Sequence, residues 1–297
     1  MSIKTSFSIK DLENLTGVKA HTIRIWEKRY DLLKPERSET NIRTYEMKSL
    51  HKLLNVSLLV SNGYKISKLS KMSEEDIYAH VKAISMDSSS NEQHLNSFKL
   101  SMLHFDQELF DVTYNKMLAV CSFREIFQET FLRLLNEISV LWMTNTISPV
   151  HERFISTLIQ QKLLLNIERV QGLSDGSSKV YALFLPMNEI HELGLLYIHF
   201  ELLLRGYKSI YLGASVPMEN LLELQKVFSE ITFVSYFTVV PVPDEVSYYL
   251  KEISEGILQN SNDDFHILGT RVQDLNTATI PEKISVYASA KDYVNSL

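Results

Sequence analysis

The apolar positions near the start of the chain recur with the spacing of two short helices. A first helix is predicted from Ser8, whose side chain can cap it, to Leu15, with its apolar residues on one face. Gly17 allows a tight turn, and a second helix is predicted from Lys19 to about Arg29. Helix, turn and helix in this order predict a helix-turn-helix, whose second helix presents its N-terminal residues to the major groove of DNA.

A polar, charged run from Arg37 to Tyr45 follows the second helix. Turn-forming residues lie in its middle and an arginine lies near each end, which predicts a wing, a β-hairpin beside the helix-turn-helix. We expect Arg37 and Arg43 to meet phosphates and Tyr45 to anchor the base of the wing. Phosphate contacts position a protein on DNA without reading its sequence.

Helical spacing then continues through two further regions. A helix is predicted from Glu46 to Ser61, followed by a short basic helical piece from Lys65 to Ser70. The polar stretch from Asp87 to Asn91 has no periodicity and predicts a linker. From His94 to Val170, four apolar-periodic segments with short breaks predict a four-helix bundle.

The pattern changes after a second linker, Gly172 to Ser178. Val180 to Pro186 is a continuous apolar run, typical of a strand buried on both faces. Further strands are predicted at 209–213, 233–237, 265–269 and near Val286, with helices at 191–205, 218–228 and 246–259 between them. This alternation predicts a parallel, doubly wound sheet of four or five strands.

The predicted fold is therefore multidomain. An all-α winged helix-turn-helix occupies residues 1–75, a four-helix bundle 92–172, and a Rossmann-like α/β domain 178–297. A length of 297 residues gives each part enough chain for a core of its own.

Charge is distributed unevenly along the chain. Residues 1–72 hold 14 Lys and Arg against 7 Asp and Glu, a net charge of +7, which leaves −13 for the remainder of a chain whose total is −6. A basic module on an acidic body is expected where only the first part meets a polyanion. Arg24, with His21 and Thr22 beside it, would read bases, whereas Lys19 and Arg29 would join the wing arginines on phosphates. The alternative is a small helical subdomain with a solvated basic face.

The rest of the composition excludes several classes of protein. Cys121 is the single cysteine, which excludes an internal disulfide and a cysteine-based metal cluster. No apolar run approaches the length of a membrane span, so we expect a cytoplasmic protein with no membrane partner. No catalytic triad, phosphate-binding glycine loop or pair of catalytic carboxylates can be argued from spacing, so an enzyme is not predicted.

His191 stands after the first predicted strand of the α/β part, in the run Glu189-Ile190-His191-Glu192-Leu193-Gly194. In an open α/β sheet, ligands bind beyond the carboxyl ends of the strands. A neutral imidazole suits cobalt and similar metals, and a nearby carboxylate can orient it. A histidine at the start of a helix is more often a cap or a surface residue, so these residues by themselves leave ligand binding open.

Residues from about Phe7 to Ser70 resemble the DNA-binding domain of the MerR family of transcription regulators. The resemblance includes the segment from Val18 to Tyr30, the Leu32-Leu33-Lys34-Pro35 stretch and the wing. It implies a double-stranded DNA operator as partner and a homo-oligomer, either dimer or tetramer. Family wings often carry glycine near the tip, where this chain has Glu39-Thr40-Asn41.

The remainder resembles cobalamin-binding proteins. Residues from about Val180 to Leu297 follow the pattern of their α/β domain, and the segment from Leu141 to Ser148 is similar to the tryptophan-containing signature of their helical cap. The whole order is similar to the cobalamin-dependent, light-responsive MerR-type repressors of carotenoid genes. In that family, light breaks the cobalt–carbon bond of adenosylcobalamin, the assembly falls apart and DNA is released.

The resemblance assigns roles to individual residues. His191 would be the lower axial cobalt ligand, oriented by Glu189, and Gly194 would allow close approach. Ser235 and Gly269 would line the slot for the nucleotide tail of the cofactor. Trp142 and Glu152 would cover the upper face, where the adenosyl group lies.

Several positions depart from the family pattern, and one of them is Pro149, which interrupts the bundle signature. Glu189 stands where the family has Asp, and Thr270 replaces the second Gly of a pair. Arg153 stands where the light-sensing members have His, and Asn145 where Gly is usual.

Three functions remain open from the sequence. The first is a transcription regulator, a repressor by resemblance, whose C-terminal half senses a corrinoid or controls oligomerisation. The second is a DNA-binding regulator whose C-terminal half has lost the ligand and serves as a protein-interaction module, for example for an anti-repressor protein. The third, a corrinoid methyltransferase subunit, does not account for a basic winged helix.

Overall fold

The computed structural model describes residues 6–37, 42–87, 91–144, 146–172, 179–273, 275 and 280–297. The chain forms two compact units, residues 1–159 and 160–297, and each is described by itself.

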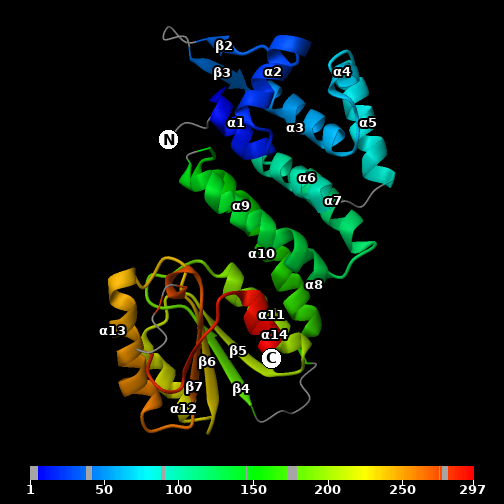
Figure 1. The fold of residues 1–297 in the computed structure, drawn as a ribbon. Helices are drawn as coiled ribbons and strands as arrows, with labels where there is room; N and C mark the ends of the chain where they lie inside the picture. The colour runs from blue at the N-terminus through cyan, green and yellow to red at the C-terminus, as the bar shows by residue number, and fades with distance from the viewer. Residues whose placement is uncertain are drawn as a thin grey trace. The chain divides into compact units, whose positions relative to one another are not determined.

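The first unit begins with a winged helix-turn-helix (Figure 1). Helix α1 spans Ile9–Thr16 and α2 spans Ala20–Tyr30. Ser8 caps α1 because its hydroxyl accepts the amide hydrogen of Asp11, and Gly17 ends it with a φ of 73°. Strands β1 (Ser6–Phe7), β2 (Glu36–Arg37) and β3 (Arg43–Glu46) form an antiparallel sheet in the order β1-β3-β2. The predicted wing is this β2–β3 hairpin, and the Glu39-Thr40-Asn41 tip lies outside the described residues.

Three helices follow the wing. Helix α3 spans Met47–Ser61 and α4 spans Ile66–Leu69, close to the predicted bounds. Helix α5 spans Glu74–Asp87 and was not predicted as a separate element. It packs against α3 and begins with Glu74, Glu75 and Asp76, which favour a helix N-terminus.

The helical bundle confirms the second predicted fold. Its helices are α6 (Asn91–His104), α7 (Gln107–Leu118), α8 (Phe123–Ile126), α9 (Leu132–Met143) and α10 (Pro149–Val170). A π-helical turn, Phe127–Phe131, joins α8 to α9 without a break, so the bundle has four helical rods as predicted. Its core is aromatic, with ring centroids of Phe98 4.9 Å from Phe110 and 5.3 Å from Phe131.

The second unit contains a five-stranded parallel sheet in the order β5-β4-β6-β7-β8. The strands span β4 Val180–Phe184, β5 Lys208–Gly213, β6 Ile231–Tyr236, β7 Asp264–Leu268 and β8 Ile284–Val286. The chain order reverses between the neighbouring strands β4 and β6, and ligands of open α/β sheets bind outside such a reversal.

Helices cover both faces of this sheet, which confirms the doubly wound prediction (Figure 1). One face packs against α13 (Pro243–Ile253), which continues as the π-helical turn Ser254–Leu258, and the other against α11 (Leu193–Leu204) and α14 (Ala290–Ser296). Between β5 and β6 lie the 3-10 turn Met218–Leu221 and the short α12, Leu222–Gln225. The 3-10 turn Thr270–Val272 follows β7.

Two predicted boundaries were wrong. Helix α11 begins at Leu193 and not at His191, because the buried Glu189 carboxylate accepts the amide hydrogens of Ile190 and His191 and holds them in a loop. The helix predicted over 218–228 is two short pieces.

Candidate DNA interface and ligand site

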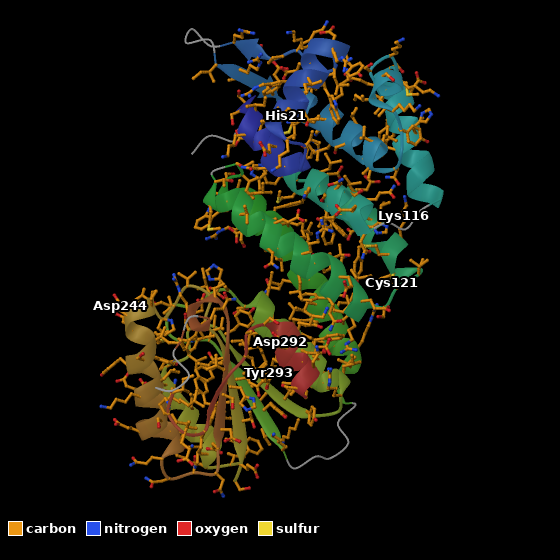
Figure 2. The ribbon with its side chains drawn as sticks, viewed as in Figure 1. His21, Lys116, Cys121, Asp244, Asp292 and Tyr293 are labelled. Atoms are coloured by element: carbon orange, nitrogen blue, oxygen red, sulfur yellow. The ribbon has the colours of Figure 1, made fainter. Side chains whose placement is uncertain are left out.

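The outward face of α2 carries the residues predicted to meet DNA. Ile23 and Trp26 bury the opposite face, which leaves Lys19, His21, Arg24 and Arg29 exposed and Thr22 half-buried; Figure 2 labels His21. Lys19 lies 3.1 Å from Glu13 of α1 through its ammonium group. An exposed pair of this kind contributes little stability, so its ammonium can exchange this partner for a phosphate.

The wing is fastened to α2 by a residue that sequence reasoning missed. The Glu27 side chain, 9% exposed, accepts a hydrogen bond from the Tyr45 hydroxyl and pairs with Arg43 Nε at 3.3 Å. Burial and the Glu27 carboxylate raise the pKa of the Tyr45 hydroxyl, so it stays a donor. The predicted anchoring role of Tyr45 therefore has a geometric basis. A single acid among cations on α2 was the available signal for Glu27.

The two wing arginines differ in their surroundings. Arg43 is half-buried beside Glu27, whereas Arg37 on β2 is exposed and opposite Arg43 in the hairpin register. Both were predicted to contact phosphates, and that role stays a prediction. The Glu27 pair gives Arg43 a second task, because it holds strand β3 against the recognition helix.

His191 and Glu189 lie together after β4, at the reversal of strand order. Glu189 is fully buried, and its Oε1 lies 2.5 Å from His191 Nδ1. Its Oε2 accepts the amide hydrogens of Val239 and Val240, at 2.6 and 2.9 Å, from the loop after β6. One carboxylate thus joins the loops on both sides of the reversal and fixes the imidazole ring.

The charge state of Glu189 follows from these bonds. Burial alone would raise the pKa of this carboxyl, but hydrogen bonds from the His191 ring and from the amides of Val240, Val239 and His191 lower it to about 2. An ionised carboxylate against Nδ1 favours a proton on that nitrogen and a lone pair on Nε2. This is the arrangement expected of a histidine that ligates a metal.

The expected tail-slot residues lie beside this pair but are closely packed. The buried Ser235 hydroxyl donates to the Phe184 carbonyl at 2.8 Å. A Cβ atom on Gly194 would meet Cε2 of Tyr236 at 2.8 Å. The Tyr236 ring therefore occupies the space beside Gly194. Gly269, with a φ of 112°, lies so close to the Phe237 carbonyl that a Cβ would meet its oxygen at 2.2 Å.

Two further features of this region were not predicted. Thr270, in place of the second family Gly, donates its hydroxyl to the Thr238 carbonyl at 2.8 Å, and so ties the loop after β7 to the loop after β6. Apolar side chains are also exposed in the loop after β4, which contains His191, and in the loop after β6: Met187, Ile190, Val239 and Val242, each between 43% and 63% exposed. Such a cluster suits a flat, largely apolar ligand.

Trp142 and Glu152 belong to the first unit. Trp142 is 50% exposed near the end of α9, next to Met143 at 68%, and Glu152 is half-buried in the first turn of α10. Asn145 lies outside the described residues. That Trp142 and Glu152 cover a ligand stays a prediction.

Among the residues that the structure describes, no group of three or more His, Cys, Asp or Glu side chains could hold a metal ion. A corrinoid would bring its own metal and ring nitrogens, and the His191–Glu189 pair could offer that metal an imidazole. Over the same described residues, no helix combines the length and apolarity that a membrane span needs.

Comparisons with known proteins agree with both halves of this description. Residues 7–76 match the family described as MerR HTH family regulatory protein, and residues 95–165 match the B12 binding domain. The chain is 28% identical over 225 residues to the HTH-type transcriptional repressor CarH of Myxococcus xanthus, covering 73% of each protein. It is 24% identical over 212 residues to the repressor CarA of the same organism, covering 70% of this chain and 68% of that one.

The fold of this chain is also similar to that of a solved structure. The monomethylamine corrinoid protein of Methanosarcina barkeri superposes with a TM-score of 0.58 at 12% identity, covering 70% of this chain and 98% of that one. At this identity the likeness shows the fold alone. Together the comparisons confirm the predicted combination of a MerR-type helix-turn-helix with a B12 binding domain.

Proposed function

We propose that this protein is a transcriptional repressor that binds a DNA operator and whose C-terminal half binds a corrinoid that controls this binding. The observation that carries the proposal is the presence, in one chain, of an exposed cationic recognition helix and a histidine fixed by a buried carboxylate at a ligand-binding edge. Both curated relatives are repressors by name, which supports a regulator and argues against an enzyme. The three parts would be residues 1–75, 92–172 and 178–297.

On DNA, the exposed N-terminal part of α2 would enter the major groove. Arg24, with His21 and Thr22, would read base edges, and Lys19, Arg29 and Arg37 would contact phosphates. Arg43 and Tyr45 would hold the wing at the correct distance through Glu27. A partly palindromic operator and a dimer or tetramer of the chain follow from the family resemblance.

On the corrinoid, His191 would supply the lower axial ligand, with Glu189 fixing its tautomer. When bound, the group supplies a cobalt centre whose upper ligand can be exchanged. The exposed apolar side chains Met187, Ile190 and Val239 would contact the ring. Gly194 would allow close approach, and Ser235 and Gly269 would line the slot for the nucleotide tail. Trp142 and Glu152 would cover the upper face, and adenosylcobalamin is the form that the resemblance favours.

One observation favours the second candidate function, a ligand-free interaction module that docks an anti-repressor protein. The Tyr236 ring covers Gly194, and the Thr270 hydroxyl binds the neighbouring loop, so the expected tail slot is filled by side chains. A methyltransferase subunit receives no such support, because it would not use a basic winged helix.

Two measurements on the purified protein test the proposal. Titration with adenosylcobalamin in the dark should give a bound absorbance spectrum that His191→Ala abolishes. Fluorescence anisotropy with duplexes from the protein's own promoter region should show salt-sensitive binding that Arg24→Ala weakens. A bound spectrum unaffected by His191→Ala would exclude the axial role, and a complete lack of spectrum with intact DNA binding would support the ligand-free module.

A further inference from the structure

A buried polar contact joins the first helix of the helix-turn-helix to the loop after α9. The Thr146 hydroxyl is fully buried and donates to Asp11 Oδ1 at 3.2 Å. Asn14 Nδ2, one turn further along α1, donates to the hydroxyl oxygens of Thr146 and Thr144 at 3.3 and 3.4 Å. The two threonine hydroxyls lie 2.9 Å apart. One face of α1 therefore rests on this loop.

The same helix also holds the start of the recognition helix. Glu13 Oε2 accepts the amide hydrogen of Ala20 at 3.1 Å, and Glu13 Oε1 pairs with Lys19 at 3.1 Å. Asp11 has a second task as well, because its Oδ2 accepts the amide hydrogen of Ser8 at 2.7 Å and so caps α1. A shift of Thr146 would thus displace Asp11 at the cap of α1. Through α1 and Glu13, it would also displace the first turn of α2.

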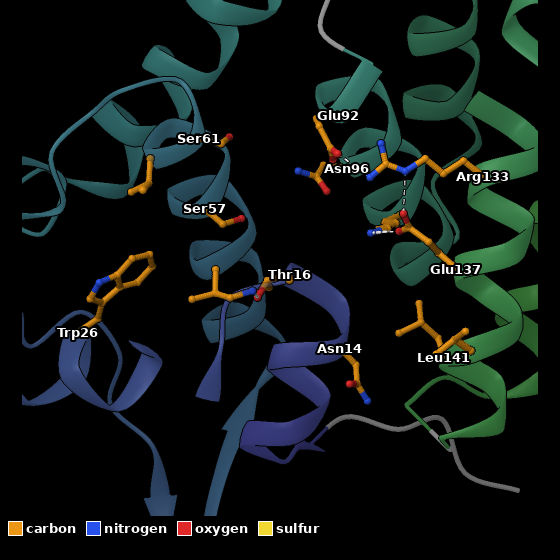
Figure 3. Close-up of a pocket in the computed structure, with 15 residues that line it drawn as sticks. Asn14, Thr16, Trp26, Ser57, Ser61, Glu92, Asn96, Arg133, Glu137 and Leu141 are labelled. Atoms are coloured by element: carbon orange, nitrogen blue, oxygen red, sulfur yellow. Dashed lines mark hydrogen bonds and ion pairs between the residues drawn. The ribbon is translucent and has the colours of Figure 1, made fainter. Parts of the chain in front are cut away.

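This boundary has a second contact and a cavity: on α3 and α6, the ring centroids of His51 and His104 lie 3.8 Å apart. A cavity of about 560 Å³ lies between the helix-turn-helix and the bundle, with Thr16 and Trp26 on one side and Arg133, Glu137 and Leu141 on the other (Figure 3). Glu137 pairs within the bundle, with Lys99 at 2.5 Å and Arg133 at 3.1 Å. Because side chains around a cavity lose packing contacts, the part of the boundary near α1 depends on the Thr146 contact more than a fully packed boundary would.

The loop that makes this contact follows the exposed end of α9. Thr146 stands four residues after Trp142, which is 50% exposed. We propose that Thr146 is a positioning residue through which the end of α9 fixes the position of the helix-turn-helix. A ligand that covers Trp142 would then change the affinity for DNA. This inference rests on the proposed function and names its route of regulation.

The experiment compares three variants of the full-length protein. Thr146→Val removes the hydroxyl and keeps the shape, and Thr146→Ser keeps the hydroxyl. Thr113→Val is the matched control, because Thr113 is a buried bundle threonine whose hydroxyl binds the Leu109 carbonyl of its own helix at 2.7 Å. The readouts are amide hydrogen exchange of residues 9–20 without ligands, and the DNA Kd with and without adenosylcobalamin in the dark.

We expect Thr146→Val to raise the exchange of residues 9–20 at least fivefold. We also expect it to reduce the effect of adenosylcobalamin on the DNA Kd to a third or less, while Thr146→Ser and Thr113→Val behave as wild type. Exchange equal to that of Thr113→Val would overturn the inference. Faster exchange with a fully retained cobalamin response would overturn it too. If wild type binds no DNA or corrinoid, the proposed function fails, and with it the regulatory role of Thr146.

Discussion

At the scale of single residues, Glu189 shows why a longer acid can replace the family Asp. Its extra methylene lets one oxygen reach the His191 ring while the other meets the amides of Val239 and Val240 in the loop after β6. The carboxylate is buried and ionised, so it orients His191 and ties two loops together.

Changing the charge of this carboxylate should weaken ligand binding. We expect Glu189→Gln to lower the affinity for adenosylcobalamin by about 10–100-fold, because partners that orient a ligating histidine contribute that much. Absorbance titration measures the effect. Glu192→Gln is the control, since Glu192 accepts a hydrogen bond from Gln160 at 3.3 Å and lies in the same loop. Equal affinities of wild type and Glu189→Gln would show that the carboxylate does not act on the histidine.

Tyr236 should decide which corrinoids bind tightly. Its ring packs on Gly194, so a nucleotide tail entering there must displace it. We expect Tyr236→Ala to tighten binding of cobalamin severalfold and to leave binding of cobinamide, which lacks the tail, within twofold. Competition between the two corrinoids measures this selectivity. A parallel change for both would mean that the ring does not stand in the path of the tail.

At the scale of elements, the wing and the recognition helix act as one part because Glu27 joins them. Tyr45→Phe should cost about 1 kcal/mol of unfolding free energy, since it removes one hydrogen bond to a largely buried carboxylate. It should also weaken binding to all duplexes alike.

Arg24→Ala, on the exposed face of the same helix, should leave the free energy of unfolding within about 0.5 kcal/mol of wild type. It should cost about 1–3 kcal/mol of binding free energy at one base position. Thermal unfolding and anisotropy separate the two effects, and identical profiles would refute the division of roles.

Most of the elements that sequence periodicity predicted have an apolar face long enough to repeat, although α5, with 14 residues, was not predicted as a separate helix. The helix-turn-helix, the bundle and the sheet were all predicted correctly for this reason. Strand β1, with two residues, and α14, with seven, are too short to show a period. The loop at His191 was taken for helix because nothing local reveals that a glutamate two residues earlier will accept its amide hydrogen.

The candidate site could be predicted only where its signal is local. The E-x-H-x-x-G run and the exposed cations of α2 are contained in short segments. The Thr146–Asp11 contact joins residues 135 positions apart, and the Glu189–Val239 contact joins residues 50 positions apart. The local spacing of residues therefore predicts neither contact. Tyr236 was missed because its ring reaches Gly194, on helix α11, from the end of strand β6.

At the scale of the whole molecule, buried histidines should make stability depend on pH. Burial lowers the pKa of His51 in the first unit, and of His199 and His266 in the second, to about 4. His199 bonds Ser209 at 2.8 Å, and His266 lies 3.3 Å from the hydroxyl of Tyr293 on α14 (Figure 2). Each imidazole is therefore neutral in the folded protein at a pH where the unfolded chain binds a proton.

The sign of the effect follows from these values. A group whose pKa is lowered by folding stabilises the folded state above its unfolded pKa, about 6.5 for histidine, and loses that contribution as pH falls toward 4. The Glu189 carboxyl, with a pKa of about 2, acts in a lower window, below about 4.5. We expect the urea concentration at the unfolding midpoint of wild type to decrease as the pH is lowered from 7 to 4.5. His199→Gln should flatten this fall, whereas Glu189→Gln should leave it in place and change only the loss at lower pH. A midpoint that is constant from pH 7 to 4.5 would mean that these imidazoles accept protons without unfolding, and so are less buried than their surroundings indicate.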